Sequence, residues 1–133
     1  MSEQNKRTVE RALAAWNDGD RETARELFAP GFDSGYGHAD REAFFESMQL
    51  WRDALDARYE IEDLLAEEDK VAVRFTVTGT HVGPFAGVEP TGESLEFGGM
   101  AIFRLEEGRI VEQRAVEELG RLYAQVGAVD WPS

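Results

Sequence analysis

Cysteine is absent from the 133-residue chain, and long apolar runs are absent too. The lack of cysteine excludes a disulfide framework, a thiol nucleophile and a thiolate metal site, and it favours a cytoplasmic protein. No apolar run approaches the roughly 20 residues that a membrane span needs. The first ten residues have no hydrophobic stretch of the kind found in secretory signals, so no signal is expected there.

Positive charge is also scarce. Lys and Arg number 14 against 27 Asp and Glu, which gives a formal net charge of −13 at pH 7. Nucleic acid and anionic membranes are therefore not expected as partners, because such a surface repels both. Lys6 and Lys70 are the only lysines. Excess acid with so little lysine is typical of halophilic proteins, although a GC-rich genome combined with an ordinary acidic surface also produces it.

Length and composition indicate one folded domain over residues 1–133. The length is that of a single ordinary domain, and no internal repeat or low-complexity linker interrupts it. Hydrophobic residues make up 42% of the chain. That share is enough to form a core and argues against disorder despite the charge.

The first half of the chain is predicted to be helical. Its expected elements are helices at residues 5–17, 20–30 and 40–56, with a glycine-rich irregular stretch at 32–39. In the first helix, Val9, Leu13 and Trp16 fall at i, i+4 and i+7, which is one apolar stripe of a 3.6-residue period. Asp20 and Asp40 are the expected N-caps of the other two helices, because an aspartate side chain can accept from the first free backbone N–H groups.

The second half changes to the period of two that is typical of strands. Residues 71–78 alternate apolar and polar side chains, and residues 58–66 and 95–118 have related patterns. A short helix is expected from Leu119 to Val126. Consecutive strands with short turns predict an antiparallel sheet, which three helices must cover on one face. The expected fold is α+β: a cone-shaped, curved antiparallel sheet wrapped around the N-terminal helices, with a cavity inside.

The hairpin with its turn at Glu107-Gly108 is the central feature of this half. Counted outward without a bulge, Ala101 faces Arg114 and Phe97 faces Glu118. This register places charges on one face with aromatic and small residues. Such a face is typical of a pocket wall, because a buried charge is costly unless it is paired or used. A single bulge would turn Glu118 to the opposite face.

Several motifs in the second half resemble a known family. They are the Gly-Thr-His-x-Gly-x-Phe step at 79–85, the Pro-Thr-Gly turn at 90–92, the Ile-Phe-Arg-x-x-x-Gly-x-Ile-Val-Glu hairpin at 102–112, and the closing segment at 126–129. Together they resemble the SnoaL-like polyketide cyclases, within the group that includes nuclear transport factor 2 and ketosteroid isomerase. The resemblance implies a conical α+β barrel and a homodimer formed through the outer face of the sheet.

The resemblance also implies a reaction. SnoaL-like cyclases close rings by an aldol-type step without metal or coenzyme, and an acidic residue after the last strand is the general acid/base. Glu118 stands at that position, as Glu where the family has Asp. Gln113-Arg114 replaces the family's His-Trp pair. These differences leave two alternatives open, a non-catalytic small-molecule binder and a dimeric interaction module.

Three residues are candidates for the chemistry. Glu118 is the expected general acid/base; the alternative is a carboxylate at the start of the last helix, and the same alternative applies to Glu117. Arg114 either holds a developing enolate oxygen or forms an ion pair with Glu112 or Glu118. His81 either polarises a carbonyl or is a loop histidine bonded to the backbone.

Aromatic residues are the candidates for binding the ligand. Each fits core packing when taken singly, but as a set they predict a cavity for a flat or polycyclic, small apolar carbonyl compound. They are Trp16, Phe32, Phe44, Trp51, Tyr59, Phe75, Phe85 and Phe97. The two histidines are far apart and have no carboxylate at ligand spacing, so neither a metal nor another cofactor is expected.

Overall fold

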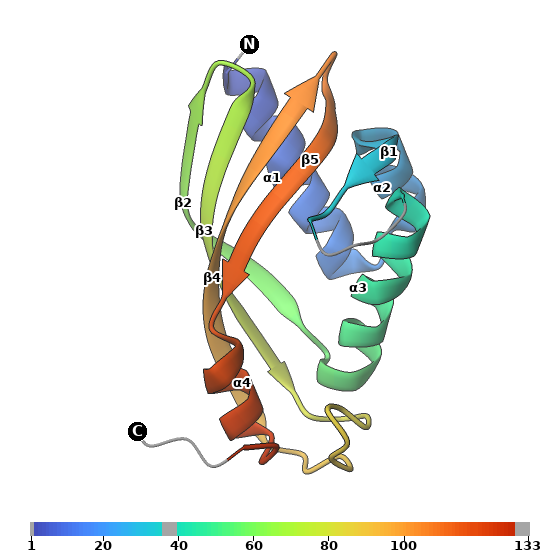
Figure 1. Cartoon of the computed structure of the whole chain (residues 1–133), viewed down its shortest axis with the longest axis vertical. Coiled ribbons are helices and arrows are strands. Elements are labelled where there is room, and N and C mark those ends of the chain that lie inside the picture. Colours follow the sequence, from blue (N-terminus) through green and yellow to red (C-terminus); the bar gives the residue numbers. More distant parts are fainter. Residues whose placement is uncertain (1, 36–39, 130–133) are drawn as a thin grey trace.

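The computed structural model describes residues 2–35 and 40–129 (Figure 1). Within these ranges no helix is long and apolar enough to cross a membrane. Residues 36–39 of the expected irregular stretch lie outside the described part. In chain order the elements are α1 (Ser2–Asp18), α2 (Arg21–Leu27), β1 (Phe28–Asp33), α3 (Arg41–Leu55), β2 (Arg58–Glu67), β3 (Lys70–Thr80), β4 (Ser94–Glu106), β5 (Arg109–Glu117) and α4 (Leu119–Gln125). This order confirms the α+β class.

The five strands form one curved, unclosed sheet in the order β1-β5-β4-β3-β2. Strands β2 to β5 pair antiparallel as expected, but β1 runs parallel to β5. The sheet is therefore mixed, and the prediction of a helix that continues to residue 30 is wrong at its end. The helix already ends at Leu27, and Pro30 and Gly31 lie on the edge strand β1, where a missing backbone donor and a weak strand former are tolerated.

The helices cover the concave face of the sheet. Figure 1 shows α1 running along the sheet and α3 standing across from it, while α4 lies at the far end beside β4. Both predicted N-caps are confirmed, since the Asp20 side chain accepts from the Thr23 N–H at 3.0 Å and the Asp40 side chain accepts from the Ala43 N–H at 3.0 Å. The caps fix where α2 and α3 begin, and so help to fix how they lie over the sheet.

An aromatic cluster fills one end of the core. The Trp16 ring lies 5.4 Å from the Phe28 ring and 5.1 Å from the Phe45 ring, measured between centroids. Phe32 and Phe44 pack into the same cluster, with 5.1 Å between their centroids. These tilted and edge-on contacts join α1, β1 and α3, which holds the helices against the sheet.

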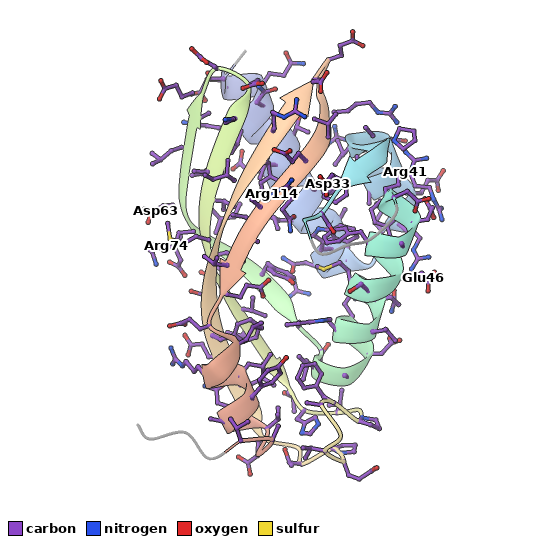
Figure 2. The ribbon with its side chains drawn as sticks, in the orientation of Figure 1. Asp33, Arg41, Glu46, Asp63, Arg74 and Arg114 are labelled. Carbon is purple, nitrogen blue, oxygen red and sulfur yellow. The ribbon has the colours of Figure 1, made fainter. Side chains whose placement is uncertain are left out.

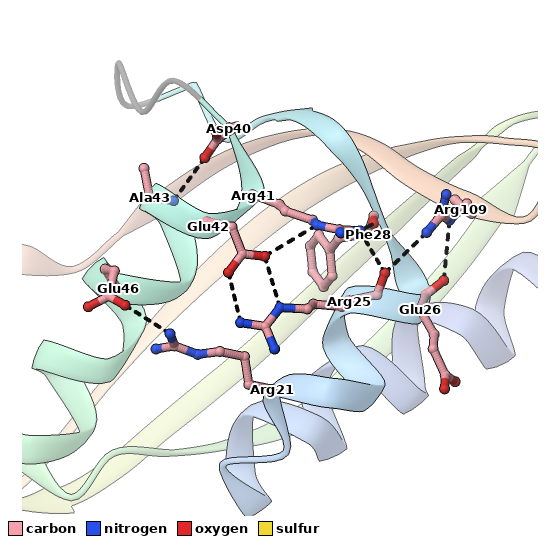
Figure 3. A network of polar contacts seen from close by, with 10 residues as sticks. All are labelled: Arg21, Arg25, Glu26, Phe28, Asp40, Arg41, Glu42, Ala43, Glu46 and Arg109. Carbon is pink, nitrogen blue, oxygen red and sulfur yellow. Dashed lines mark hydrogen bonds and ion pairs between the residues drawn. The ribbon is translucent and has the colours of Figure 1, made fainter.

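Near the aromatic cluster, arginine side chains on the surface connect α2 with α3, β1 and β5 (Figure 3). Arg25 on α2 forms a bidentate ion pair with Glu42 on α3, with hydrogen bonds of 3.0 and 2.9 Å. Arg41 donates to the Phe28 carbonyl oxygen at 2.9 Å, and Arg109 donates to the carbonyl oxygens of Arg25 and Glu26. The Arg25 and Glu42 side chains are about half exposed, so their ion pair adds little to stability, and its main effect is to hold α2 beside α3.

The β4–β5 hairpin contains one extra residue. Its turn is as predicted, since Glu107 and Gly108 both have positive φ, 51° and 79°. Leu105 pairs with Ile110, but Arg104 pairs with Glu112, so Val111 is an unpaired bulge residue. The register predicted beyond this point is wrong by one residue, and every β5 side chain from Glu112 onward lies on the opposite face from the one expected.

Candidate functional site

A cavity of about 260 Å³ lies between the concave face of the sheet and helices α1 and α3. The sheet leaves space for this cavity because the inward-facing side chains in the middle row across its strands are small. In that row Val73 pairs with Ala101, and Ala101 pairs with Ala115. Larger side chains on the rows to either side bound the cavity along the strands.

Five of the eight predicted aromatic residues lie in the cavity wall. They are Trp16 on α1, Phe44 and Trp51 on α3, Tyr59 on β2 and Phe75 on β3. Because they come from helices on one side and strands on the other, the cavity has apolar surfaces facing one another across it. That shape suits a flat ligand.

The other three aromatic residues are not in the cavity wall, which corrects their predicted place. Phe32 is fully buried against Phe28 in the aromatic cluster, with ring centroids 4.8 Å apart. Phe97 and Phe85 pack against Trp51 from outside the cavity, at 5.9 and 5.7 Å. Periodicity marks an aromatic residue as buried, but it does not distinguish the wall of a cavity from the layer behind it.

Glu117 is the carboxylate that faces the cavity. Its Oε2 atom is buried and has no hydrogen-bond partner among the described residues. Burial raises the pKa of Glu117 above its ordinary value of 4.5, because the charged form loses solvation that no partner replaces. A carboxyl group in this condition is the kind that exchanges protons near neutral pH.

Gly99 explains why the side chain of Glu117 is largely buried. Phe75, Gly99 and Glu117 form one row across the sheet. A Cβ atom on Gly99 would lie only 2.7 Å from Cζ of Phe75 and 2.9 Å from Cγ of Glu117. The aromatic ring and the stem of the acid therefore share the space that a side chain at Gly99 would fill. This contact places an apolar ring against the acid.

Gln113 is the second polar side chain that β5 contributes to the cavity wall. It is only 8% exposed and lies opposite Phe103 on the row beyond the two alanines. Ser47 on α3 and Tyr59 on β2 bring hydroxyl groups to the same cavity. The Tyr59 hydroxyl lies 4.0 Å from Sδ of Met48. The cavity is thus mainly apolar, with a few polar groups at separate points.

Glu118 faces away from the cavity, so its predicted orientation is wrong. Its Oε1 atom accepts from the Gly98 N–H at 2.6 Å and lies 3.6 Å from the Arg121 guanidinium group. Its side chain is about half exposed. The bulge at Val111 is the cause, because it exchanges the faces on which Glu117 and Glu118 lie.

Arg114 also lies outside the cavity wall. Its guanidinium group is 3.1 Å from Asp33 and 3.5 Å from Glu112 (Figure 2). The predicted ion pair with Glu112 is therefore present, whereas Asp33 was not foreseen because β1 was not predicted. Hydrogen bonds from the Gly35 N–H and from Arg114 lower the pKa of the Asp33 carboxyl group.

His81 is fully buried after β3 and does not line the cavity. Its Nδ1 atom accepts from the Thr91 N–H at 3.3 Å and lies 3.1 Å from Oγ1 of Thr91. Backbone hydrogen bonds to Gly92 and Glu93 reinforce this link. The structure agrees with the alternative of a loop histidine bonded to the backbone, one that fastens the two ends of the loop between β3 and β4.

From the sequence, Glu117 had a weaker claim than Glu118, and Gln113 was not expected to face the cavity. One signal was available, since Gly98-Gly99 interrupts an otherwise regular strand. A glycine inside a strand indicates a bulge or a close approach by another group. Among residues 2–35 and 40–129, no group of three or more His, Cys, Asp or Glu side chains could hold a metal ion.

The curved sheet, the covering helices and the enclosed cavity define the architecture of the nuclear transport factor 2-like proteins. Within that class, residues 6–126 match the model of the SnoaL-like polyketide cyclases. The chain belongs to this family. No curated protein matches the chain closely enough to add to this.

Solved structures with the same fold come from several bacteria. AclR, a proposed hydroxylase from Streptomyces galilaeus, is 28% identical with a TM-score of 0.89, and the match covers 100% of this chain and 87% of that one. IdmH, a proposed polyketide cyclase from Streptomyces antibioticus, is 32% identical with a TM-score of 0.83, over 93% and 99% of the two chains. A SnoaL-like protein from Jannaschia sp. CCS1 is 27% identical with a TM-score of 0.87, over 97% and 95%.

Proposed function

We propose that this protein is a cofactor-independent acid/base catalyst that acts on a small apolar carbonyl compound. The observation that carries the proposal is Glu117, whose Oε2 atom is buried at a mainly apolar cavity and has no hydrogen-bond partner among the described residues. An unbonded buried acid costs stability and is unusual in a folded protein. Its position at the cavity is explained if its partner is the ligand.

The proposed reaction begins when the Glu117 carboxylate removes a proton from a carbon next to a carbonyl group. The C–H electron pair forms the new C=C bond, and the π pair of the carbonyl group moves to its oxygen, which gives an enolate. In a ring closure, the enolate carbon then attacks a second carbonyl of the same molecule, and Glu117 returns its proton to the new alkoxide. In an isomerisation, the proton returns to a different carbon. A raised pKa suits both steps, since the acid must take and release the proton near neutral pH.

The similar structures support the class of ligand but not one reaction. IdmH is a proposed cyclase and AclR a proposed hydroxylase, although the two share one fold with this chain. Fold therefore leaves the chemistry open, and the assignment here depends on the site. The hydroxyl groups of Ser47 and Tyr59 are candidates to donate to the enolate oxygen, because both reach the same cavity.

The test is proton exchange at the activated carbon of β-tetralone in D2O, followed by NMR. We expect the wild-type protein to accelerate exchange over buffer, and Glu117→Gln to lose about 10²- to 10⁴-fold of that acceleration, the usual contribution of a general base. Glu118→Gln is the matched control, because it makes the same chemical change on the opposite face of the sheet. Equal losses in the two variants, or no acceleration by the wild type, would contradict the proposal.

We further propose that a second copy of the chain covers the outer face of the sheet, as the family resemblance implies. Met100, Ile102 and Val116 are exposed there at 55%, 50% and 72%. The Arg74–Asp63 ion pair lies at the side of this patch, on the convex side of the sheet (Figure 2). An apolar patch beside charges is typical of an association surface.

Light scattering on a size-exclusion column tests the dimer. We expect the wild type to elute as a dimer and Val116→Lys to elute as a monomer. Leu50→Lys is the matched control, because Leu50 on α3 is exposed to a similar extent, 68%, but lies on another face. A monomeric wild type, or dissociation by Leu50→Lys alone, would contradict this assignment.

A further inference from the structure

We propose that the ligand is compact and carries a functional group at each end. It has no more than two fused rings, an enolisable ketone at the Glu117 end, and a hydroxyl or carbonyl group at the other end that bonds to the side-chain amide of Gln113. The first of these ends rests on the proposed function. The size of the ligand and the role of Gln113 do not, because they follow from the cavity alone.

The spacing of the two polar residues along β5 gives the length of the ligand. Gln113 and Glu117 both face the cavity and are four residues apart. With a rise of about 3.3 Å per residue, their Cα atoms lie about 13 Å apart along the strand. Ala115 stands between them and contributes only a methyl group. A ligand that lies over Ala115 therefore meets a polar group at each end and an apolar surface in the middle.

Gln113 is suited to recognise a ligand because its amide has no other partner in the described part of the chain. The residue is 8% exposed, and the hydrogen bonds found for it among the described residues are made by its backbone, which pairs with Phe103 and whose carbonyl oxygen accepts from Arg114 at 2.8 Å. Since the amide both donates and accepts, it fits a hydroxyl group or a carbonyl group equally well.

The volume of the cavity limits the ligand. At about 260 Å³, it lies below the range of about 300 to 1,000 Å³ that is usual for drug-sized ligands. Trp16 and Phe44 pack into the aromatic cluster behind them, so the wall on that side is fixed. Leu119 in the same wall is 39% exposed, which places the opening beside Glu117 and the Gln113 end inside. A hydrogen bond of about 3 Å at each end of the roughly 13 Å between Gln113 and Glu117 leaves about 7 Å for the ligand, which is the length of two fused rings.

The experiment compares three ketones by isothermal titration: β-tetralone, its 6-hydroxy derivative, and the three-ring ketone anthrone. We expect the wild type to bind the hydroxylated ketone about tenfold more tightly than β-tetralone, as one added hydrogen bond in a buried site allows. Anthrone should bind more weakly than either. Gln113→Met, which has a similar volume but no amide, should bind both tetralones equally.

Two further variants keep the outcomes distinct. Gln113→Asn retains the amide but withdraws it by one methylene, so it should lose part of the tenfold preference, and it carries the test if Gln113→Met does not fold. Glu117→Gln should keep the preference while losing proton exchange. If Glu117→Gln keeps full exchange, the proposed acid/base function fails and the role of Gln113 stands.

Four results would overturn the inference. They are equal binding of the two tetralones by the wild type, an unchanged preference in Gln113→Met, anthrone binding as tight as that of the bicyclic ketones, and no saturable binding of either tetralone. Each of these concerns affinity alone, so none depends on whether Glu117 is a catalyst.

Discussion

Glu117 and Glu118 are neighbours in the chain, yet the end of β5 turns them to opposite sides of the sheet. Outside, Glu118 accepts a hydrogen bond from the Gly98 N–H and lies near Arg121. Inside, Glu117 has an aromatic ring against its stem and no partner for Oε2 among the described residues. The two carboxylates are chemically identical, so their different surroundings alone decide which can act as a base.

The next polar pair on β5 repeats this contrast. Arg114 on the outer face is held by Asp33 and Glu112. Gln113 on the inner face is buried with its amide toward the cavity wall. Outward polar groups on this strand are bonded to neighbouring side chains, whereas we propose that the inward groups bind a ligand. This difference suggests that the inner groups serve function more than stability, because unpaired buried polar groups destabilise a fold.

Deleting Ala115 should have the largest effect, because it shifts the faces of β5 by one residue. Either Glu118 turns inward beyond the deletion, or Val111 enters the ladder and Glu112 and Arg114 turn inward. Burying such charges without their partners costs several kcal/mol each, so we expect a loss of more than about 3 kcal/mol in the free energy of unfolding, measured by urea denaturation. Deleting Val111 is the matched control, because it removes only the unpaired residue, keeps the pairs Leu105–Ile110 and Arg104–Glu112, and should cost about 1 kcal/mol. Equal losses in the two deletion variants would show that the register of β5 does not set the faces.

Gly99→Ala should have the next largest effect. The added methyl group would lie within 3 Å of both Phe75 and Glu117, whose positions are fixed by packing. We expect a loss of about 1 to 3 kcal/mol in stability, the usual cost of overpacking, together with slower proton exchange. Gly98→Ala is the matched control, since its closest new contact is the flexible carboxylate of Glu118 at 3.1 Å. Equal effects at both glycines would contradict the proposed close packing around Glu117.

The pH dependence of stability should differ in sign between the two faces. The pKa of Glu117 is raised by burial above its ordinary value of 4.5. Between that value and the raised pKa, the folded protein binds more protons than the unfolded chain, so rising pH lowers stability. Glu117→Gln removes this loss, and its stability relative to the wild type should therefore rise with pH above about 4.5.

Asp33 on the outer side gives the opposite sign. Its pKa is lowered below the ordinary value of 3.8 by the Gly35 N–H and by Arg114. The stabilisation is therefore present above pH 3.8 and is lost as pH falls through the lowered pKa. Asp33→Asn should lose stability relative to the wild type as pH rises, and thermal unfolding across a pH series measures both variants. If the stabilities of Glu117→Gln and Asp33→Asn, each relative to the wild type, changed in the same direction with pH, the contrast between the two faces would be refuted.

Arg114→Gln should have the smallest effect. Its ion pairs are solvent-exposed, and such pairs contribute little. We expect proton exchange and ligand affinity to stay within about twofold of the wild-type values. A tenfold loss of either proton exchange or ligand affinity would contradict this and would support the predicted role of Arg114 in holding a developing enolate oxygen.

Much of the fold could be predicted because it depends on local preferences. The caps at Asp20 and Asp40 and the turn at Glu107-Gly108 are interactions within a few residues, so the residue types alone indicate them. Alternation marked the strands, and helical spacing marked Trp16 as a core residue. The family motifs predicted the α+β class as well, because they lie at the turns and along the strands that define it.

The candidate site could be predicted only in part, because it depends on one residue of register. Alternation alone cannot reveal that Val111 is unpaired, since that outcome is settled by contacts between β4, β5 and β1. The family motif, counted along the chain, placed the acid at Glu118, whereas the bulge placed Glu117 in the cavity. By itself the sequence determined the order of the elements and every element except β1, because propensities and caps act locally. Only the tertiary structure decided which carboxylate is buried, because a shift of one residue exchanges the faces of a strand.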